Sequence, residues 1–206
     1  MRANLRAGVA IYNEGRFHAA HDAWEDYWLD LDSGTDDELL LHGLIQFTAV
    51  VYHLEQNNDA GAQGLAESAT GYLSTLPADY RGIDLANVRP FLETIAADPA
   101  RARETEPPKL RQDRQPLGYE DLDFEATAIV ATVLAEEDGY DLDAIEAAIA
   151  YAREEIDTAG DGPFTGLVFA FVREPDRRAT VVQRLQSHVD RERGKETDVD
   201  GLFEKR

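Results

Sequence analysis

One stretch of the chain constrains the fold more than any other. Residues 38–55 read ELLLHGLIQFTAVVYHLE, which is apolar on most sides when it is wound into a helix. A helix that is apolar nearly all round has to be covered by other elements, so it belongs in the centre of a bundle. We therefore predict an all-α fold, a multihelical bundle with a central apolar helix, few or no strands and a C-terminal helical extension.

The rest of the chain shows the same helical periodicity. Apolar residues recur every three or four positions in most segments. Residues 124–134 and 164–172 alternate well enough to be strands, but their alanine content and the lack of a hairpin turn between them favour helices. The predicted helices span residues 4–14, 17–30, 37–55, 60–76, 87–97, 124–134, 141–157, 164–172 and 176–193. Thr35 or Asp36 is expected to cap the third helix, and Pro90 is expected in the first turn of the fifth.

Prolines mixed with charges mark one boundary in the chain. Pro107, Pro108 and Pro116 lie in a stretch without helical periodicity. We predict a helical core domain over residues 1–106 and a Pro-rich linker over residues 107–120. A C-terminal helical region over residues 121–193 and a charged tail over residues 194–206 are expected to follow.

Charge limits the environment and the partners of the protein. The chain has 41 acidic and 20 basic residues, a net charge of −21, and only three of its basic residues are lysines. Such a surface repels itself at low ionic strength, and molar salt screens the repulsion. We therefore expect a halophilic protein with the surface of an acidic proteome. No basic face offsets this charge, so nucleic acid is excluded as a partner.

Several functional classes are excluded by what the sequence lacks. There are no cysteines, hence no disulfide or thiolate metal site. The phosphate-binding, dinucleotide-binding and zinc-protease motifs are missing. No secretory signal and no membrane span is visible, so we expect a cytoplasmic protein that does not interact with membranes.

Four polar side chains interrupt the apolar faces of the second and third predicted helices. His21 and Glu25 are four positions apart, so their side chains meet on the core side of one helix. Gln46 and His53 are seven positions apart, two turns along the next helix. If the two helices pack antiparallel, all four side chains converge between them.

These residue types allow metal or acid–base chemistry. Imidazole and carboxylate groups are ligands that divalent metal ions use in proteins, and they also act as general acids and bases. We predict His21, Glu25 and His53 as metal ligands, and Glu25 and Gln46 as catalytic residues. The cofactor would be a divalent metal ion. In the alternative interpretation His21 and Glu25 only satisfy each other, and Gln46 completes a network that fixes the helix register.

The remaining histidines give weaker signals. His18 and Asp22 are also four positions apart, but they lie on a more exposed face and are expected to form a solvated ion pair. His42 and His188 have no partner that the sequence reveals.

The two segments YNEGRFHAAHDAWEDYW and LLHGLIQFTAVVYHLEQNNDAGAQGLAESATGYL resemble the domain of unknown function 309 family. That family shows an A-H-E-x-x-E-x-x-W signature, then G-L-I-Q, then Y-H and G-N-x-x-G-A. The positions that match are Ala20, His21, Glu25, Trp28, Gly43, Gln46, His53, Asn58, Gly61 and Ala62. Asp22 stands where glutamate is usual, and Asn57 stands where glycine is usual.

The resemblance implies an all-α multihelical fold and brings the label of a metal-dependent hydrolase. It covers about residues 4–76, and the extension after Pro107 resembles that of salt-loving archaeal members. Two functions from different classes stay open. One is a metal-dependent hydrolase that uses the His/Glu cluster. The other is a non-catalytic binding or scaffolding module for a small molecule or protein partner, in which the polar cluster is structural.

Overall fold

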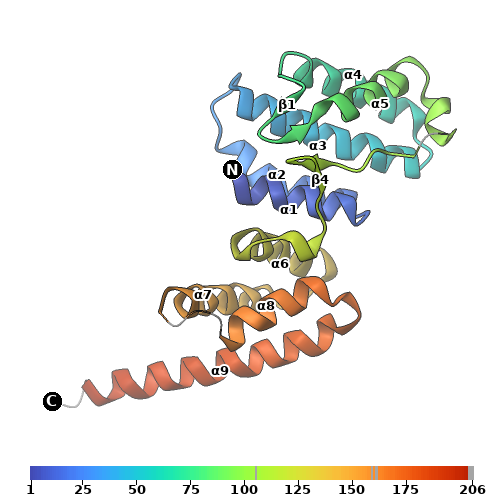
Figure 1. The fold of residues 1–206 in the computed structure, drawn as a ribbon. Helices are drawn as coiled ribbons and strands as arrows, with labels where there is room; N and C mark the ends of the chain where they lie inside the picture. The colour runs from blue at the N-terminus through green and yellow to red at the C-terminus, as the bar shows by residue number, and fades with distance from the viewer. Residues whose placement is uncertain (105, 159, 161, 204–206) are drawn as a thin grey trace. The chain divides into compact units, whose positions relative to one another are not determined.

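The chain divides into two compact units. The computed structural model describes residues 1–104, 106–158, 160 and 162–203. Unit 1 comprises Met1–Ala126 and unit 2 comprises Thr127–Arg206, so the division falls inside helix α6 (Phe124–Asp138). The described residues hold nine α-helices and only short strands, which confirms the predicted all-α class (Figure 1).

Five helices follow one another in unit 1, and each packs on the next. Helix α3 contacts both α2 and α4, as expected for the apolar helix at the centre of the bundle. The bounds are α1 (Arg2–Asn13), α2 (Phe17–Leu29), α3 (Asp36–Glu55), α4 (Asp59–Leu73) and α5 (Leu85–Ala97). Thr35 caps α3, because its side chain accepts a hydrogen bond from the Glu38 amide at 3.3 Å.

The amino end of α5 differs from the prediction. The helix begins at Leu85, so Pro90 is its sixth residue and lies beyond the first turn. The Arg89 guanidinium donates to the carbonyl oxygens of Leu73 and Leu76 at the end of α4. These contacts join helix α5 to the end of helix α4.

The core of unit 1 is built from large side chains and two glycines that let helices approach closely. The largest fully buried side chains include Trp24, Phe47 and Leu73. A Cβ atom at Gly8 of α1 would lie 2.1 Å from the Trp24 indole, and one at Gly43 of α3 would lie 2.5 Å from Leu73. Any larger residue at either glycine would therefore separate the neighbouring helices.

A short four-stranded antiparallel sheet accompanies these helices. Its strands are β1 (Asp79–Tyr80), β2 (Ile83–Asp84), β3 (Arg111–Gln112) and β4 (Gln115–Pro116), paired in that order. Two turns close the hairpins, and all four turn residues have positive φ: Arg81, Gly82, Asp113 and Arg114. The sequence did not predict this sheet, because strands of two residues carry no periodicity.

The Pro-rich segment 107–120, expected to be a linker, is bonded to helix α1. The buried side chain of Asn13 donates to the carbonyl oxygens of Leu110 and Leu117 and accepts from the Leu110 amide, each at 2.9 Å. The Tyr12 hydroxyl donates to the Pro108 carbonyl at 3.0 Å. The segment also supplies β3 and β4, so in the structure it belongs to unit 1. Whether residues 1–106 fold as a separate domain stays a prediction.

The regular elements in the described part of unit 2 are all helices. Beyond α6 it contains α7 (Leu142–Thr158), α8 (Pro163–Arg173) and α9 (Arg178–Phe203). The ambiguous segments 124–134 and 164–172 are both helical, as predicted. The backbone of α9 continues as helix past Arg193, where the sequence suggested a charged tail, and residues 204–206 of that tail lie outside the described part.

Short segments of 3-10 helix connect several of these elements. They are η1 (Pro99–Glu104), η2 (Tyr119–Asp121) and η3 (Pro175–Arg177). None of the described helices is long and apolar enough to cross a membrane.

Candidate functional site

Helix α2 brings one imidazole and two carboxylates together. His21 Nδ1 lies 3.0 Å from Asp22 Oδ1 and 3.8 Å from Glu25 Oε2. One ligand atom from each of the three residues lies within 4.8 Å of the other two. We call His21, Asp22 and Glu25 the α2 cluster. Its members come from one helix, so their mutual placement is fixed by local backbone geometry alone.

The α2 cluster lies at the margin of the core and not inside it. The side chains of His21, Asp22 and Glu25 are 32%, 41% and 44% exposed. The expectation that His21 and Glu25 lie on the core side is therefore wrong. The buried face of α2 is occupied by smaller and apolar residues, namely Ala19, Ala20, Ala23 and Trp24.

His18 extends the cluster toward solvent. Its Nδ1 lies 3.3 Å from Asp22 Oδ2, and its side chain is 66% exposed. This is the solvated pair expected from the sequence. The His18 ring also lies against Tyr52 of α3, with 6.4 Å between centroids, so the cluster adjoins the carboxyl-terminal end of that helix.

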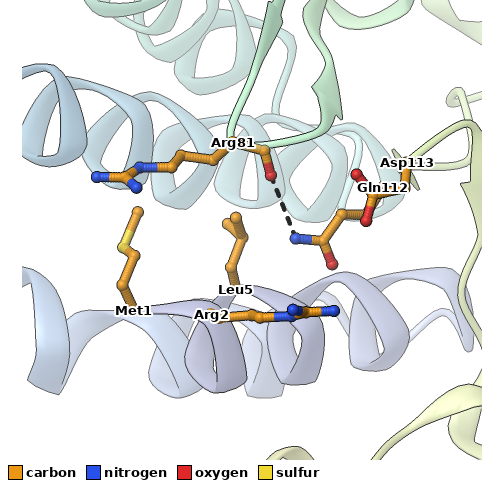
Figure 2. Close-up of a pocket in the computed structure, with 6 residues that line it drawn as sticks. All are labelled: Met1, Arg2, Leu5, Arg81, Gln112 and Asp113. Atoms are coloured by element: carbon orange, nitrogen blue, oxygen red, sulfur yellow. Dashed lines mark hydrogen bonds between the residues drawn. The ribbon is translucent and has the colours of Figure 1, made fainter.

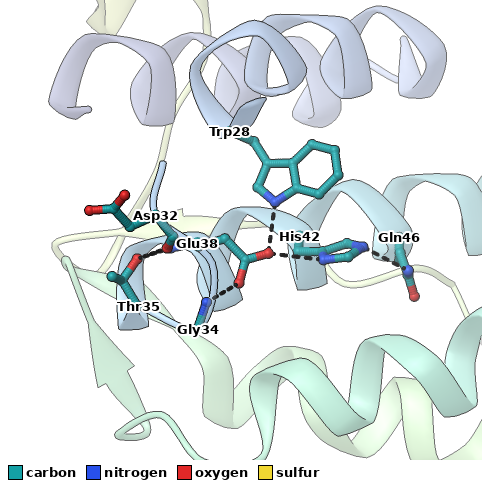
Figure 3. A network of polar contacts seen from close by, with 7 residues as sticks. All are labelled: Trp28, Asp32, Gly34, Thr35, Glu38, His42 and Gln46. Carbon is teal, nitrogen blue, oxygen red and sulfur yellow. Dashed lines mark hydrogen bonds and ion pairs between the residues drawn. The ribbon is translucent and has the colours of Figure 1, made fainter. Parts of the chain in front are cut away.

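Gln46 makes its polar contact elsewhere, with a residue that the sequence analysis left without a partner. Gln46 Nε2 lies 3.2 Å from His42 Nε2, and His42 Nδ1 lies 3.1 Å from Glu38 Oε1. Figure 3 shows the three side chains in a row along α3. We call Glu38, His42 and Gln46 the α3 ladder. Their spacing of i, i+4 and i+8 is a signal that was readable in the sequence.

Glu38 is the best-satisfied member of the α3 ladder. Its carboxylate accepts hydrogen bonds from Trp28 Nε1 at 2.9 Å, from the Gly34 amide at 3.1 Å and from His42 (Figure 3). Burial alone would raise the pKa of Glu38, but these hydrogen bonds outweigh it and hold the pKa below its ordinary value. The side chain is 11% exposed and ionised at neutral pH.

Aromatic rings enclose His42 on both sides. The imidazole stacks on Tyr72 of α4 with 3.8 Å between centroids, and it lies 4.6 Å from the Trp28 ring. The consistent hydrogen arrangement places a proton on Nδ1, facing Glu38, and leaves Nε2 to accept from Gln46. Gln46 Oε1 is then buried without a hydrogen-bond partner in the described part of the chain.

His53 is engaged at the start of α4. Asn58 caps that helix, because its Oδ1 accepts from the Gly61 amide at 3.1 Å. This contact fixes the Asn58 amide, whose Nδ2 then donates to His53 Nδ1 at 2.7 Å. The hydrogen of His53 is consequently on Nε2, so His53 could bind a metal ion only after releasing Asn58.

The family motif has glycine at two positions near Asn58, which are Asn57 and Gly61 in this chain. The local geometry explains both. A Cβ atom at Gly61 would lie 2.6 Å from Asn58 Nδ2 and 2.9 Å from His53 Nδ1, so only glycine leaves room for this contact. Asn57 has φ of 57°, the left-handed conformation in which glycine is usual and asparagine is tolerated. Part of the recognised motif therefore serves the turn between α3 and α4.

The structure thus joins two of the four predicted site residues with each other. His21 and Glu25 are together, and Asp22 completes their group although it was predicted only as a partner of His18. Gln46 and His53 contact His42 and Asn58 respectively. Their assignment as catalytic residue and metal ligand stays a proposal.

Comparisons with known proteins agree with this placement of the motif. A curated relative is an uncharacterized protein from Aquifex aeolicus (strain VF5), 25% identical over 91 residues. The match covers 44% of this chain and 27% of the relative, so the chain spans about a quarter of that relative's length. The family described as "Domain of unknown function (DUF309)" matches residues 5–65, which include most of α1, all of α2 and α3, and the α2 cluster. Residues 5–65 of the chain are therefore similar to the DUF309 family.

Proposed function

We propose that the region similar to the DUF309 family binds a divalent transition-metal ion at the α2 cluster and acts as a metal-dependent hydrolase. The proposal rests on one observation, the three ligand atoms of His21, Asp22 and Glu25 within 4.8 Å of one another. Ligands bound to one tetrahedral zinc ion lie roughly 3.4 Å apart. The distances of 3.0 and 3.8 Å from His21 Nδ1 to the carboxylate oxygens of Asp22 and Glu25 bracket that value.

The exposure of the cluster fits a catalytic site better than a purely structural metal site. Three protein ligands would leave at least one coordination position for water, as in catalytic zinc sites. A bound metal ion lowers the pKa of its water to about 7 and so supplies hydroxide at neutral pH. His21 and the two carboxylates would hold the ion, and His18 would lie next to Asp22, where it can orient that ligand.

A binding or scaffolding module is the second candidate, and a specific observation favours it. Gln46, His53, Asn58 and Gly61 all make contacts within or between helices α3 and α4. These motif residues therefore have structural roles that need no substrate. In this case the α2 cluster would be a solvated group of ion pairs on the surface of a domain that binds another protein or a small molecule.

Metal content separates the two candidates. The protein should be purified without chelator in molar KCl, because of its net charge of −21, and its metal measured by elemental analysis. Chelator-treated protein is then titrated with Zn²⁺ or Mn²⁺ by calorimetry. We expect one ion per chain, with affinity reduced about 100-fold or more in His21→Ala and Asp22→Asn.

A matched control uses a histidine of unit 2. His188→Ala removes an imidazole that contacts Phe164, and it should leave metal affinity unchanged. His53→Ala tests the remaining predicted ligand and should have little effect if Asn58 keeps that ring. No bound metal, or equal affinity in all variants, would contradict the metal site.

The hydrolase part of the proposal needs its own measurement. Metal-loaded protein should hydrolyse a chromogenic ester or phosphodiester, and Asp22→Asn should remove that turnover together with the metal. Metal binding without turnover on either substrate class would favour the binding module. Glu25→Gln keeps the shape of the side chain and distinguishes loss of a ligand from loss of fold.

A further inference from the structure

A pocket in unit 1 is not explained by the proposed metal site. It has a volume of about 420 Å³ and lies in unit 1 between the start of α1 and the two hairpin turns. Its lining residues are Met1, Arg2, Leu5, Arg81, Gln112 and Asp113 (Figure 2). None of them belongs to the α2 cluster or the α3 ladder, so the pocket can be tested separately.

The side chain of Gln112 has a hydrogen-bond acceptor that a ligand could use. The residue is 5% exposed, and its Nε2 donates to the Arg81 carbonyl oxygen at 3.3 Å. Its Oε1 is buried and has no hydrogen-bond partner in the described part of the chain. In Figure 2 this oxygen points toward the wall that α1 forms. Turning the amide over would set two acceptors against each other, so the orphan oxygen is fixed in place.

A buried acceptor without a partner is unfavourable, and a donor supplied by a ligand removes the penalty. The charges of the other lining residues indicate which further groups such a ligand would have. Arg2 and Asp113 form no ion pair with any other described residue, so each presents an uncompensated charge at the pocket. Arg81 does not, because Asp37 holds its guanidinium through two hydrogen bonds of 2.8 and 2.6 Å.

Among its described residues the pocket therefore offers the unpaired cation of Arg2, the unpaired anion of Asp113 and a buried neutral acceptor, beside the α-ammonium group of Met1, which donates to Asn4 Oδ1 at 3.5 Å. Leu5, which is 1% exposed, and the Met1 side chain add an apolar wall. A ligand that matches all of these has a carboxylate, an adjacent ammonium group and an apolar side chain. It also has no net charge, so the strongly negative field of this protein does not repel it.

We propose that this pocket binds a small zwitterion of the α-amino acid type with an apolar side chain. The carboxylate pairs with Arg2, and the ammonium donates to Gln112 Oε1 and faces Asp113. The apolar side chain lies against Leu5 and Met1. The volume suits a ligand of this size, since it falls at the lower end of the range of small-molecule sites.

The test uses L-leucine and three relatives that each lack one feature. The full chain, with any affinity tag at the carboxyl end because Met1 lines the pocket, is titrated by NMR or calorimetry in molar KCl. L-Leucine should bind with saturation. 4-Methylpentanoate, which lacks the amino group, and 3-methylbutylamine, which lacks the carboxylate, should each bind about tenfold more weakly or worse. 2-Hydroxy-4-methylpentanoate keeps a hydrogen-bond donor but lacks the cation, so its affinity should lie between those of L-leucine and 4-methylpentanoate.

Two variants assign the contacts. Arg2→Gln changes an exposed residue and should bring L-leucine down to the affinity of 3-methylbutylamine. Gln112→Met keeps the side-chain volume and should weaken every ligand that carries a donor, while 4-methylpentanoate is unaffected. Arg111→Gln, an exposed arginine on the same strand as Gln112 that does not line the pocket, is the control and should behave as the original protein.

Three results would overturn the proposal. L-Leucine could fail to bind at about 10 mM, which would leave water as the partner of Gln112. 4-Methylpentanoate could bind as tightly as L-leucine, which would make the site an ordinary carboxylate site. L-Leucine could also bind equally well to Arg2→Gln, which would place it elsewhere on the protein.

Discussion

The α2 cluster and the α3 ladder are built from the same local pattern and differ in almost everything else. Each joins an acid and a histidine four positions apart, Glu25 with His21 and Glu38 with His42. The α2 pair is 3.8 Å apart with side chains 32% and 44% exposed. The α3 pair is 3.1 Å apart with side chains 20% and 11% exposed. Identical spacing therefore does not produce an identical environment.

The difference comes from the neighbours that each pair meets. Around Glu38 the indole of Trp28 and the amide of Gly34 supply donors, and the ring of Tyr72 covers His42. Glu38 also lies in the first turn of α3, where the helix dipole favours an anion. The α2 cluster has no such donors from other helices among the described hydrogen bonds. A group that is satisfied from several helices holds them together, whereas a group open to water is free to take a ligand.

Salt is expected to have the largest effect and to act on the whole chain. With a net charge of −21, the folded state should gain stability as KCl rises to above about 2 M, where the Debye length is a few Å. We expect the melting temperature to rise by about 10 °C or more, equivalent to roughly 3–5 kcal/mol. Thermal unfolding followed by circular dichroism measures this. A flat or falling melting temperature would contradict salt adaptation.

Removing one acid from the α3 ladder and one from the α2 cluster should have clearly different effects on the free energy of unfolding. Glu38→Ala leaves the three donors of Trp28, Gly34 and His42 without their acceptor, and should lower the free energy of unfolding by about 3 kcal/mol. Glu25→Ala is its control and should change stability by less than about 0.5 kcal/mol. Denaturant unfolding in 2 M KCl removes most of the contribution of surface charge. Equal losses in the two variants would show that exposure does not distinguish the groups.

The smallest expected effect concerns one hydrogen bond and its pH dependence. The pKa of Glu38 is lowered in the folded state, so its contribution to stability is present above its ordinary value of 4.5 and is lost as pH falls through the folded pKa. Trp28→Phe keeps a ring but removes the Nε1 donor, so it should raise the folded-state pKa of Glu38. The pH range over which the protein loses stability on acidification should then become narrower. We expect a loss of about 1 kcal/mol at pH 7 that disappears at low pH.

The free energy of unfolding is measured at several pH values from 7 to below the folded-state pKa of Glu38. Tyr27→Phe, on the same helix, is a control for removing a polar aromatic group without touching Glu38. If Trp28→Phe lowers the free energy of unfolding by the same amount at every pH, the indole stabilises the protein only by packing.

The helices were predictable because each carries its own pattern. The apolar sequence of α3 and the Thr35 cap are both local signals, and the structure has both. The sheet was not predictable, since Ile83 pairs with Gln112 across a long stretch of chain. The contacts of the Pro-rich segment could not be predicted for a related reason. Prolines near residue 108 predict irregular backbone, but only the fold shows that Asn13 bonds to that backbone.

The candidate site was half predictable. His21 and Glu25 meet because they lie one helical turn apart, which the sequence fixes. Which side of α2 faces the core was misjudged, because the large Trp24 and small alanines together define that side. The partners of Gln46 depend on the same helix and were readable, yet His42 was treated as isolated. The contact of His53 with Asn58 needed the geometry of the turn between α3 and α4.

The close approach of Gly8 to Trp24 also has an optical consequence. The chain has only two tryptophans, and they sit in different surroundings. Trp24 is fully buried against α1, and its Nε1 has no hydrogen-bond partner among the described residues, whereas Trp28 donates to a carboxylate beside His42. Their emission spectra should therefore differ, with the Trp28 signal sensitive to quenching by the imidazole. In Trp28→Phe the remaining emission reports the α1–α2 contact alone, and the difference spectrum reports the α3 ladder.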